Sequence, residues 1–226
     1  MAVDQDEEWQ RLWTGVKEFA EWFPDGMILI GGLAVWLHGQ DKLDKRYLEI
    51  SHDADLLLSL ADYADLRDIE EVTRNRRLNK HQVIKNQIDF DLYIEEHNDL
   101  SIPYIEADQH ACRIGAFRVL ALEHLLVLKC DAALARTGAK GEKDLRDLLR
   151  IVTLLDAPDS DRFAGRLAGK RIKVLHRAGA RTDLFNDLTG GNRHEAAKIR
   201  RRFEKNLELL ENIAQNADDR SPHTHP

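Results

Sequence analysis

Aspartates alternate with apolar residues in two short segments, and this pattern constrains the fold more than any other feature of the sequence. Asp53 and Asp55 begin one apolar run, and Asp89 and Asp91 lie within another. Because the side chains of a strand alternate between its two faces, each pair of aspartates points to one side of its strand. Carboxylates buried without partners are costly, so the pattern indicates either a bound metal ion or ion pairs.

A double glycine precedes the first pair of aspartates. The apolar strand expected at 27–30 leads directly into Gly31 and Gly32, and a helix is expected from Leu33 to His38. Glycine lets the backbone approach a phosphate closely, and the N–H groups at a helix start bind anions. Ser51, two residues before Asp53, falls on the same face of the strand. A double glycine alone more often marks a tight turn, and the aspartates that follow make phosphate binding the better interpretation.

Hydrophobic periodicity predicts an α+β fold with a mixed sheet and flanking helices, followed by a helical C-terminal half. We expect an α/β core over residues 1–118, a helical region over 119–217 and a disordered polar tail over 218–226. The expected strands are 27–30, 52–59, 82–84 and 88–94, and a tight turn is expected at Lys85-Asn86. The expected helices are 6–22, 33–38, 61–71, the segment around 122–128, 144–155, 160–178 and 193–215.

The composition favours a cytoplasmic protein without a membrane segment. The N-terminus is acidic where a secretory signal would be basic, and no apolar run approaches the length of a membrane span. Cys112 and Cys130 have no CxxC pattern and no companion metal ligands, so they are expected to be reduced thiols without chemistry.

Charge is distributed unevenly along the chain. The net charge is −7, yet residues 166–205 carry 12 Lys and Arg against 4 Asp and Glu. Such a basic stretch can attract a polyanion such as RNA. The simpler alternative is a solvated helix face, or a surface that docks on acidic residues of the same chain.

The order of these motifs carries a family resemblance. A double glycine, then Ser51-x-Asp53-x-Asp55, then an isolated acidic strand resembles the nucleotidyltransferase superfamily with a polymerase-β-like core. The segment 122–129, with Lys129 on a helix, and the Lys-Asp-x-x-Asp-Leu sequence at 143–148 are similar to the AbiEii-type branch. This branch comprises the toxins of abortive-infection toxin–antitoxin pairs and their MenT relatives. The resemblance covers roughly residues 27–155 and implies Mg²⁺-dependent transfer of a nucleoside monophosphate from an NTP to a hydroxyl.

The resemblance also implies residue roles. Mg²⁺ would be held by Asp53, Asp55 and Asp89, with Asp91 as the alternative third carboxylate. The triphosphate would contact Gly31, Gly32 and Ser51, phosphate would be bound by Lys129, and Asp147 would orient or activate groups in the site. The simpler interpretation of Lys129 is a surface lysine whose stem packs on an amphipathic helix. Residues 143–147 are alternatively an exposed lattice of charges at helical spacing.

Two departures from the family pattern keep other functions open. Glu49 stands where the family has an arginine two residues before the Ser/Thr, with Arg46 the nearest candidate, and the gap between Gly32 and Asp53 is long. The acceptor implied by the resemblance is the 3′ end of tRNA or a protein, and the implied partner is a cognate antitoxin. The alternatives are an aminoglycoside-type small-molecule nucleotidyltransferase and a non-catalytic binding module.

Overall fold

The computed structural model describes residues 2–75, 80–163 and 165–220, and their side chains except at 2–5, 46 and 217–220. The chain forms two compact units. The first comprises the residues up to His38 together with Glu49–Ala121, and the second comprises Gly39–Leu48 together with the residues from Leu122 onward. The division at 121–122 lies close to the boundary expected near 118. That the segment 39–48 belongs with the C-terminal helices was not predicted.

One mixed sheet organises the first unit. Within the described residues its strand order is β3-β4-β5-β2-β1-β7-β6. The strands are β1 (Met27–Ile30), β2 (Ala54–Leu58), β3 (Thr73–Asn75), β4 (Lys80–Lys85), β5 (Ile88–Ile94), β6 (Cys112–Ile114) and β7 (Phe117–Val119). The central strands β2 and β5 run parallel, whereas β1–β2 and β4–β5 are antiparallel.

The turn between β4 and β5 lies one residue later than the sequence predicts. Its central residues are Asn86 and Gln87, with φ of 53° and 64°. Two successive positive φ values are characteristic of the two-residue hairpin turns that match the twist of the strands. Asn86 favours this conformation, whereas a glutamine rarely adopts it, which explains why the residue pattern alone misplaced the turn.

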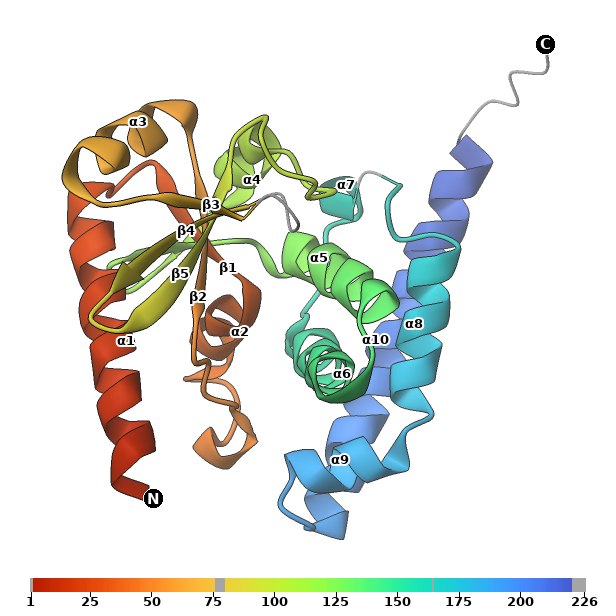
Figure 1. Ribbon diagram of the computed structural model, residues 1–226. Helices are drawn as coiled ribbons and strands as arrows, with labels where there is room; N and C mark the ends of the chain where they lie inside the picture. Colours follow the sequence, from red (N-terminus) through yellow and green to blue (C-terminus); the bar gives the residue numbers. More distant parts are fainter. Residues whose placement is uncertain (1, 76–79, 164, 221–226) are drawn as a thin grey trace. The chain divides into compact units, whose positions relative to one another are not determined.

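Helix α1 (Ala2–Trp22) covers one face of the sheet, along which it runs in Figure 1. The rings of Phe19 in α1 and Phe90 in β5 pack with their centroids 4.8 Å apart. Because side chains alternate along β5, Asp89 and Asp91 point to the face opposite α1. The other helices of this unit are α2 (Gly31–Gly39), whose last residue already belongs to the second unit, α3 (Leu60–Ile69) and α4 (Tyr104–His110).

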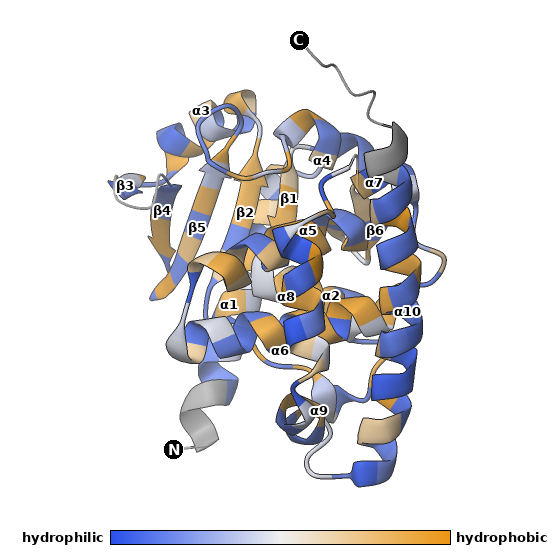
Figure 2. Ribbon diagram, turned by 90° about the vertical axis from the view of Figure 1, so that its right-hand side faces the viewer, coloured by the Kyte–Doolittle hydropathy of each residue, from blue (hydrophilic) through white to orange (hydrophobic). Residues whose placement is uncertain are grey.

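The second unit is helical. Its elements are η1 (Lys45–Tyr47), α5 (Leu122–Ala135), α6 (Gly138–Leu154), α7 (Ser160–Phe163), α8 (Lys170–Gly179), α9 (Thr182–Leu188) and α10 (Arg193–Arg220). Apolar residues of α5 and α6 form much of its core, whereas the side of α10 seen in Figure 2 is mainly hydrophilic. Helix α10 extends into the residues expected to form a tail, and residues 221–226 lie outside the described part of the chain.

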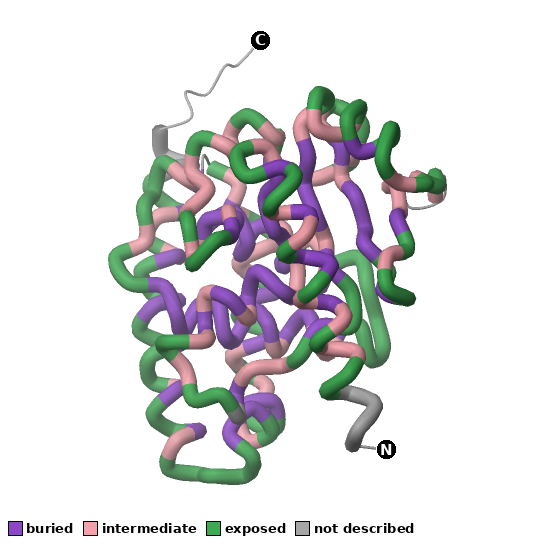
Figure 3. Tube along the Cα trace, turned by 90° about the vertical axis from the view of Figure 1, so that its left-hand side faces the viewer, coloured by how far each residue is buried: buried purple, intermediate pink, exposed green. Residues whose placement is uncertain are grey.

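The predicted α+β class, with a mixed sheet, flanking helices and a helical C-terminal half, is confirmed. The single helix expected over 160–178 is instead α7 and α8. They are separated by Gly165 and Gly169, which have φ of 74° and 61°. Buried residues gather in the strands and on the inner sides of the helices, and the connecting segments are largely exposed (Figure 3). Within the described ranges, no helix is sufficiently long and apolar to cross a bilayer.

Candidate functional site

The four aspartates of the sequence motif lie on or next to two neighbouring parallel strands. Asp55 of β2 pairs in register with Asp91 of β5, and the pair before it is Ala54 with Phe90. Asp53 and Asp89 each lie two residues before these aspartates. Alternation along the strands therefore turns Asp55, Asp89 and Asp91 toward one side. We call these three residues, together with Asp53 immediately before β2, the aspartate face.

Gly31 brings the double glycine to this face. Its φ is +68°, and a Cβ atom built on it would lie 1.9 Å from Oδ2 of Asp55. The contact follows from the sheet register, because Ile30 of β1 pairs with Asp55. Only glycine satisfies both the left-handed backbone and the close approach of the carboxylate. The start of α2 is therefore in direct contact with one predicted metal ligand.

Asp89 and Asp91 differ in their surroundings although both point to the aspartate face. Asp91 is buried, forms an ion pair with Lys80, and accepts a hydrogen bond of 2.8 Å from Nε2 of Gln82. Asp89 is exposed, and its carboxylate forms no hydrogen bond or ion pair with another described residue. Lys80 thus balances one of the four carboxylates and leaves Asp89 accessible. Lys80 was not predicted from the sequence, because it reaches Asp91 only through the β4–β5 pairing, in which Gln82 stands opposite Asp91.

Ser51 contacts Asp53 directly. The Ser51 hydroxyl is buried and donates a hydrogen bond of 3.0 Å to Oδ1 of Asp53, which is exposed. The two side chains therefore lie together, although both residues precede β2 and are not on a strand. A triphosphate contact by Ser51 stays a prediction.

The donor chemistry of the aspartate face fits a hard divalent cation, since all four side chains offer carboxylate oxygens. The Asp55 carboxylate packs against Gly31, with its Oδ2 in the place that a Cβ of residue 31 would otherwise take. In the described part of the chain, however, no group of three or more His, Cys, Asp or Glu side chains is arranged to hold a metal ion. Metal binding by Asp53, Asp55 and Asp89 therefore stays a prediction.

In the second unit, Lys129 and Asp147 form part of a buried ion-pair network. Nζ of Lys129 lies 3.2 Å from Asp144 and 2.7 Å from Asp147, and the Arg150 guanidinium lies 2.9 Å from Asp147. These four residues, Lys129, Asp144, Asp147 and Arg150, are each at most 8% exposed. The alternative of an exposed charge lattice is therefore wrong for Asp144 and Asp147, and Lys129 is not a surface lysine. Its predicted role in phosphate binding stays a prediction.

Arg150 was missed at the sequence level, although its spacing of three from Asp147 on a helix is a usable signal. Its Nε also donates a hydrogen bond of 2.7 Å to the backbone carbonyl of Tyr47. The network therefore anchors the segment 39–48 to α6, which explains why this segment belongs to the second unit.

Many cations of the basic stretch 166–205 are paired within the second unit. Arg171 forms two hydrogen bonds to Asp131, which raise the pKa of the guanidinium, and Arg181 contacts both Asp183 and Glu142. The same contact with Arg181 lowers the pKa of Asp183. Ion pairs with acidic residues of the same unit thus account for part of the positive charge of residues 166–205.

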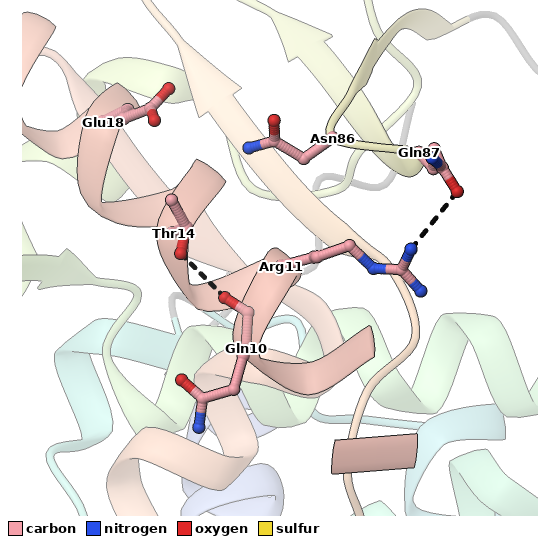
Figure 4. Close-up of a pocket in the computed structure, with 6 residues that line it drawn as sticks. All are labelled: Gln10, Arg11, Thr14, Glu18, Asn86 and Gln87. Carbon is pink, nitrogen blue, oxygen red and sulfur yellow. Dashed lines mark hydrogen bonds between the residues drawn. The ribbon is translucent and has the colours of Figure 1, made fainter. Parts of the chain in front are cut away.

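A shallow hollow of about 390 Å³ lies between α1 and the β4–β5 turn (Figure 4). Arg11 and Gln87 cross it with a hydrogen bond of 3.2 Å. Because α1 covers the face of β5 opposite the aspartates, this hollow does not belong to the aspartate face.

The chain matches no protein-family model, and no curated protein matches it significantly. Among solved structures, it is similar to the crystal structure of the Megavirus polyadenylate synthase, with a TM-score of 0.47 and 13% sequence identity. The similarity covers 91% of this chain and 50% of that one, so the chain spans about half the length of that protein. We therefore argue function from the residues of the site itself.

Proposed function

We propose that the chain is a Mg²⁺-dependent nucleotidyltransferase, which moves a nucleoside monophosphate from an NTP to a hydroxyl and releases pyrophosphate. The observation that carries this proposal is the in-register pairing of Asp55 with Asp91, together with the contact between Asp55 and Gly31. A group of carboxylates, of which Asp53 and Asp89 are exposed, beside a glycine-led helix start suits a cation and a phosphate chain at once.

Asp53, Asp55 and Asp89 would hold the ion. Lys80 already forms an ion pair with Asp91, whereas Asp53 and Asp89 are exposed and neither forms an ion pair with another described residue. Bound Mg²⁺ would neutralise charge on the phosphates and on the attacking oxygen. This distribution of charge favours Asp89 over Asp91 as the third ligand.

The start of α2 supplies the opposite polarity. Gly31 and Gly32 are the first residues of this helix, whose N–H groups carry partial positive charge. Beside the carboxylates, these N–H groups can donate hydrogen bonds to phosphate oxygens that the aspartates would otherwise repel. Ser51 can turn its hydroxyl from Asp53 to a phosphate oxygen once that carboxylate binds a cation.

Lys129 as a phosphate ligand and Asp147 as an orienting residue are proposals that rest on the sequence resemblance. In the buried network, Lys129 balances Asp144 and Asp147. If it left them, Arg150 and the half-exposed Arg136 would be the cations still in contact with these carboxylates. The geometry therefore favours a positioning role for Lys129 and Asp147, in which their ion pair holds α5 against α6.

The acceptor and the partners are proposed on the same basis. The AbiEii-type resemblance suggests the 3′ end of tRNA or a protein as acceptor and a cognate antitoxin as partner. The test incubates the full chain with α-labelled NTPs, Mg²⁺ and total RNA, and in parallel with protein and aminoglycoside acceptors. Label on a macromolecule or on the aminoglycoside identifies the acceptor. No label on any acceptor, with each NTP supplied, contradicts the proposal.

A non-catalytic binding module is the second candidate. The ion pair between Lys80 and Asp91 favours it, since one acid of the motif is already satisfied within the protein. Glu49 in place of the family arginine favours it too. Calorimetry with an NTP and Mg²⁺ separates the two, because a binding module retains nucleotide without transferring label.

A further inference from the structure

A cavity of about 450 Å³ opens within the second unit, and the aspartate face contributes nothing to it. Its walls come from the segment 39–48, the C-terminal part of α6 and the first turns of α10. Leu43, Tyr47 and Ile199 provide apolar surface. This volume lies in the range of small-molecule sites, which combine apolar walls with a few polar groups.

Cations predominate among its charged residues. Lys42, Lys198 and Arg202 line the cavity, and so do the carboxylates of Asp44 and Glu195. Glu195 lies 4.0 Å from Lys198, and Asp44 has an interaction of its own. The side chains of Lys42 and Arg202 have neither hydrogen bonds nor ion pairs with other described residues.

The first turn of α10 adds positive potential. This helix of 28 residues begins at Arg193, and Asn192, which also lines the cavity, caps it. The side-chain oxygen of Asn192 accepts hydrogen bonds of 3.1 Å from the backbone N–H of His194 and 3.3 Å from that of Glu195. The start of a long helix attracts anions by its dipole.

Thr153 provides a separate indication of a ligand. It is 3% exposed, lines the cavity, and its buried Oγ1 has no hydrogen-bond partner among the described residues. A threonine within a helix commonly bonds to a carbonyl of the preceding turn, and here it does not. Buried hydroxyls are nearly always satisfied, so a ligand oxygen is the natural partner.

We propose that this cavity binds a small molecule that carries a phosphate group. Arg202 and Lys42 supply the charge for the phosphate, Thr153 donates a hydrogen bond, and the surface of Leu43 and Ile199 contacts the rest of the molecule. The site needs no metal ion and is independent of nucleotidyl transfer.

The test measures calorimetric binding of inorganic phosphate, AMP and adenosine to the full chain in EDTA. We expect phosphate and AMP to bind in the millimolar range or tighter, and adenosine not to bind. Tighter binding of AMP than of phosphate identifies a nucleotide-like ligand, and equal binding identifies a free phosphate. Either result supports the site.

Substitutions then locate the binding. Arg202→Gln should weaken it at least about tenfold, and the nearly isosteric Thr153→Val several-fold. Arg201→Gln is the matched control, because Arg201 donates to the Ala197 carbonyl of the same helix and does not line the cavity. Asp55→Asn should leave binding in EDTA unchanged, which separates this site from the aspartate face. Absence of phosphate and AMP binding, wild-type binding by both cavity variants, or loss of binding in Asp55→Asn overturns the proposal.

Discussion

The aspartate face of the first unit and the buried network of the second both contain aspartates and lysine, but they differ in charge balance. In the network, two cations face two carboxylates, and all four side chains are nearly inaccessible. On the aspartate face, Lys80 contacts Asp91, while Asp53 and Asp89 are exposed. The balanced group is explained by folding alone, whereas the unbalanced one is poised for a charged ligand.

The comparison also shows why a motif match is weak evidence for Lys129 and Asp147. A Lys-Asp-x-x-Asp-Leu sequence on a helix fits both a catalytic role and a structural one. Burial and pairing distinguish the two roles, and neither can be read from spacing. Substitutions that remove one charge from each region should therefore have contrasting effects on stability.

Asp147→Ala should have the largest effect on stability. Lys129 and Arg150 would each lose a carboxylate partner in a buried setting, so the free energy of unfolding should fall by about 3–5 kcal/mol. Urea denaturation measures this loss, with the exposed Asp89→Ala as the control expected to change little. A loss below about 1 kcal/mol, the value typical of exposed pairs, would show that the network is solvated.

Gly31→Ala should be the next most destabilising change. The left-handed backbone is strained for alanine, and the new Cβ would displace the Asp55 carboxylate, so a loss of about 2–3 kcal/mol is expected. Gly115→Ala is the matched control, since its φ is +60° and nothing lies within 4 Å of its Cβ position. The difference between the two variants in thermal melting isolates the contact with Asp55. Equal losses would contradict that contact.

Asp91→Ala and Asp89→Ala should separate stability from transfer. Loss of Asp91 leaves Lys80 and Gln82 without their shared partner and should cost about 1–2 kcal/mol. Loss of Asp89 should leave stability unchanged and abolish transfer. Denaturation and label-transfer assays on both variants check this. An inactive Asp91→Ala beside a normal Asp89→Ala would identify Asp91 as the third carboxylate.

The smallest expected effect is the pH dependence contributed by His81 in β4. Burial lowers its pKa, and the positive charges of Arg74, His97 and Arg67 lower it further. The unfolded chain therefore binds this proton more readily, so stability should fall as pH decreases through about 6.5. His81→Gln should flatten the dependence of melting temperature on pH between neutral and mildly acidic solution. Parallel profiles for the variant and the wild type would remove this assignment.

Local patterns predicted the central strands and most helices. A short continuous apolar run marks 27–30, alternation marks 88–94, and an apolar helical pattern marks the segment around 122–128. They missed β3, β6 and β7, each three residues long, since such strands are defined by their partners across the sheet. The place of the segment 39–48 in the second unit could not be predicted, because the hydrogen bond between Arg150 and the Tyr47 carbonyl joins residues far apart in sequence.

The candidate site could be predicted in part. Alternation correctly placed the aspartates on one side, and the double glycine correctly preceded a helix. The pairing of Lys80 with Asp91 depends on the β4–β5 register, which spacing does not reveal. The burial of Lys129 depends on the packing of α6 against α5, which apolar periodicity does not fix for a single lysine.

The most direct test of the central claim is label transfer from an α-labelled NTP by wild type, Asp53→Ala and Asp55→Ala in Mg²⁺, with thermal melting of each. Each substitution removes a proposed metal ligand and relieves repulsion among the aspartates. We expect transfer by the wild type, its loss in EDTA, its loss in both variants, and melting temperatures equal to or above that of the wild type. Full transfer by either variant would contradict the assignment of the aspartate face as a metal-dependent site.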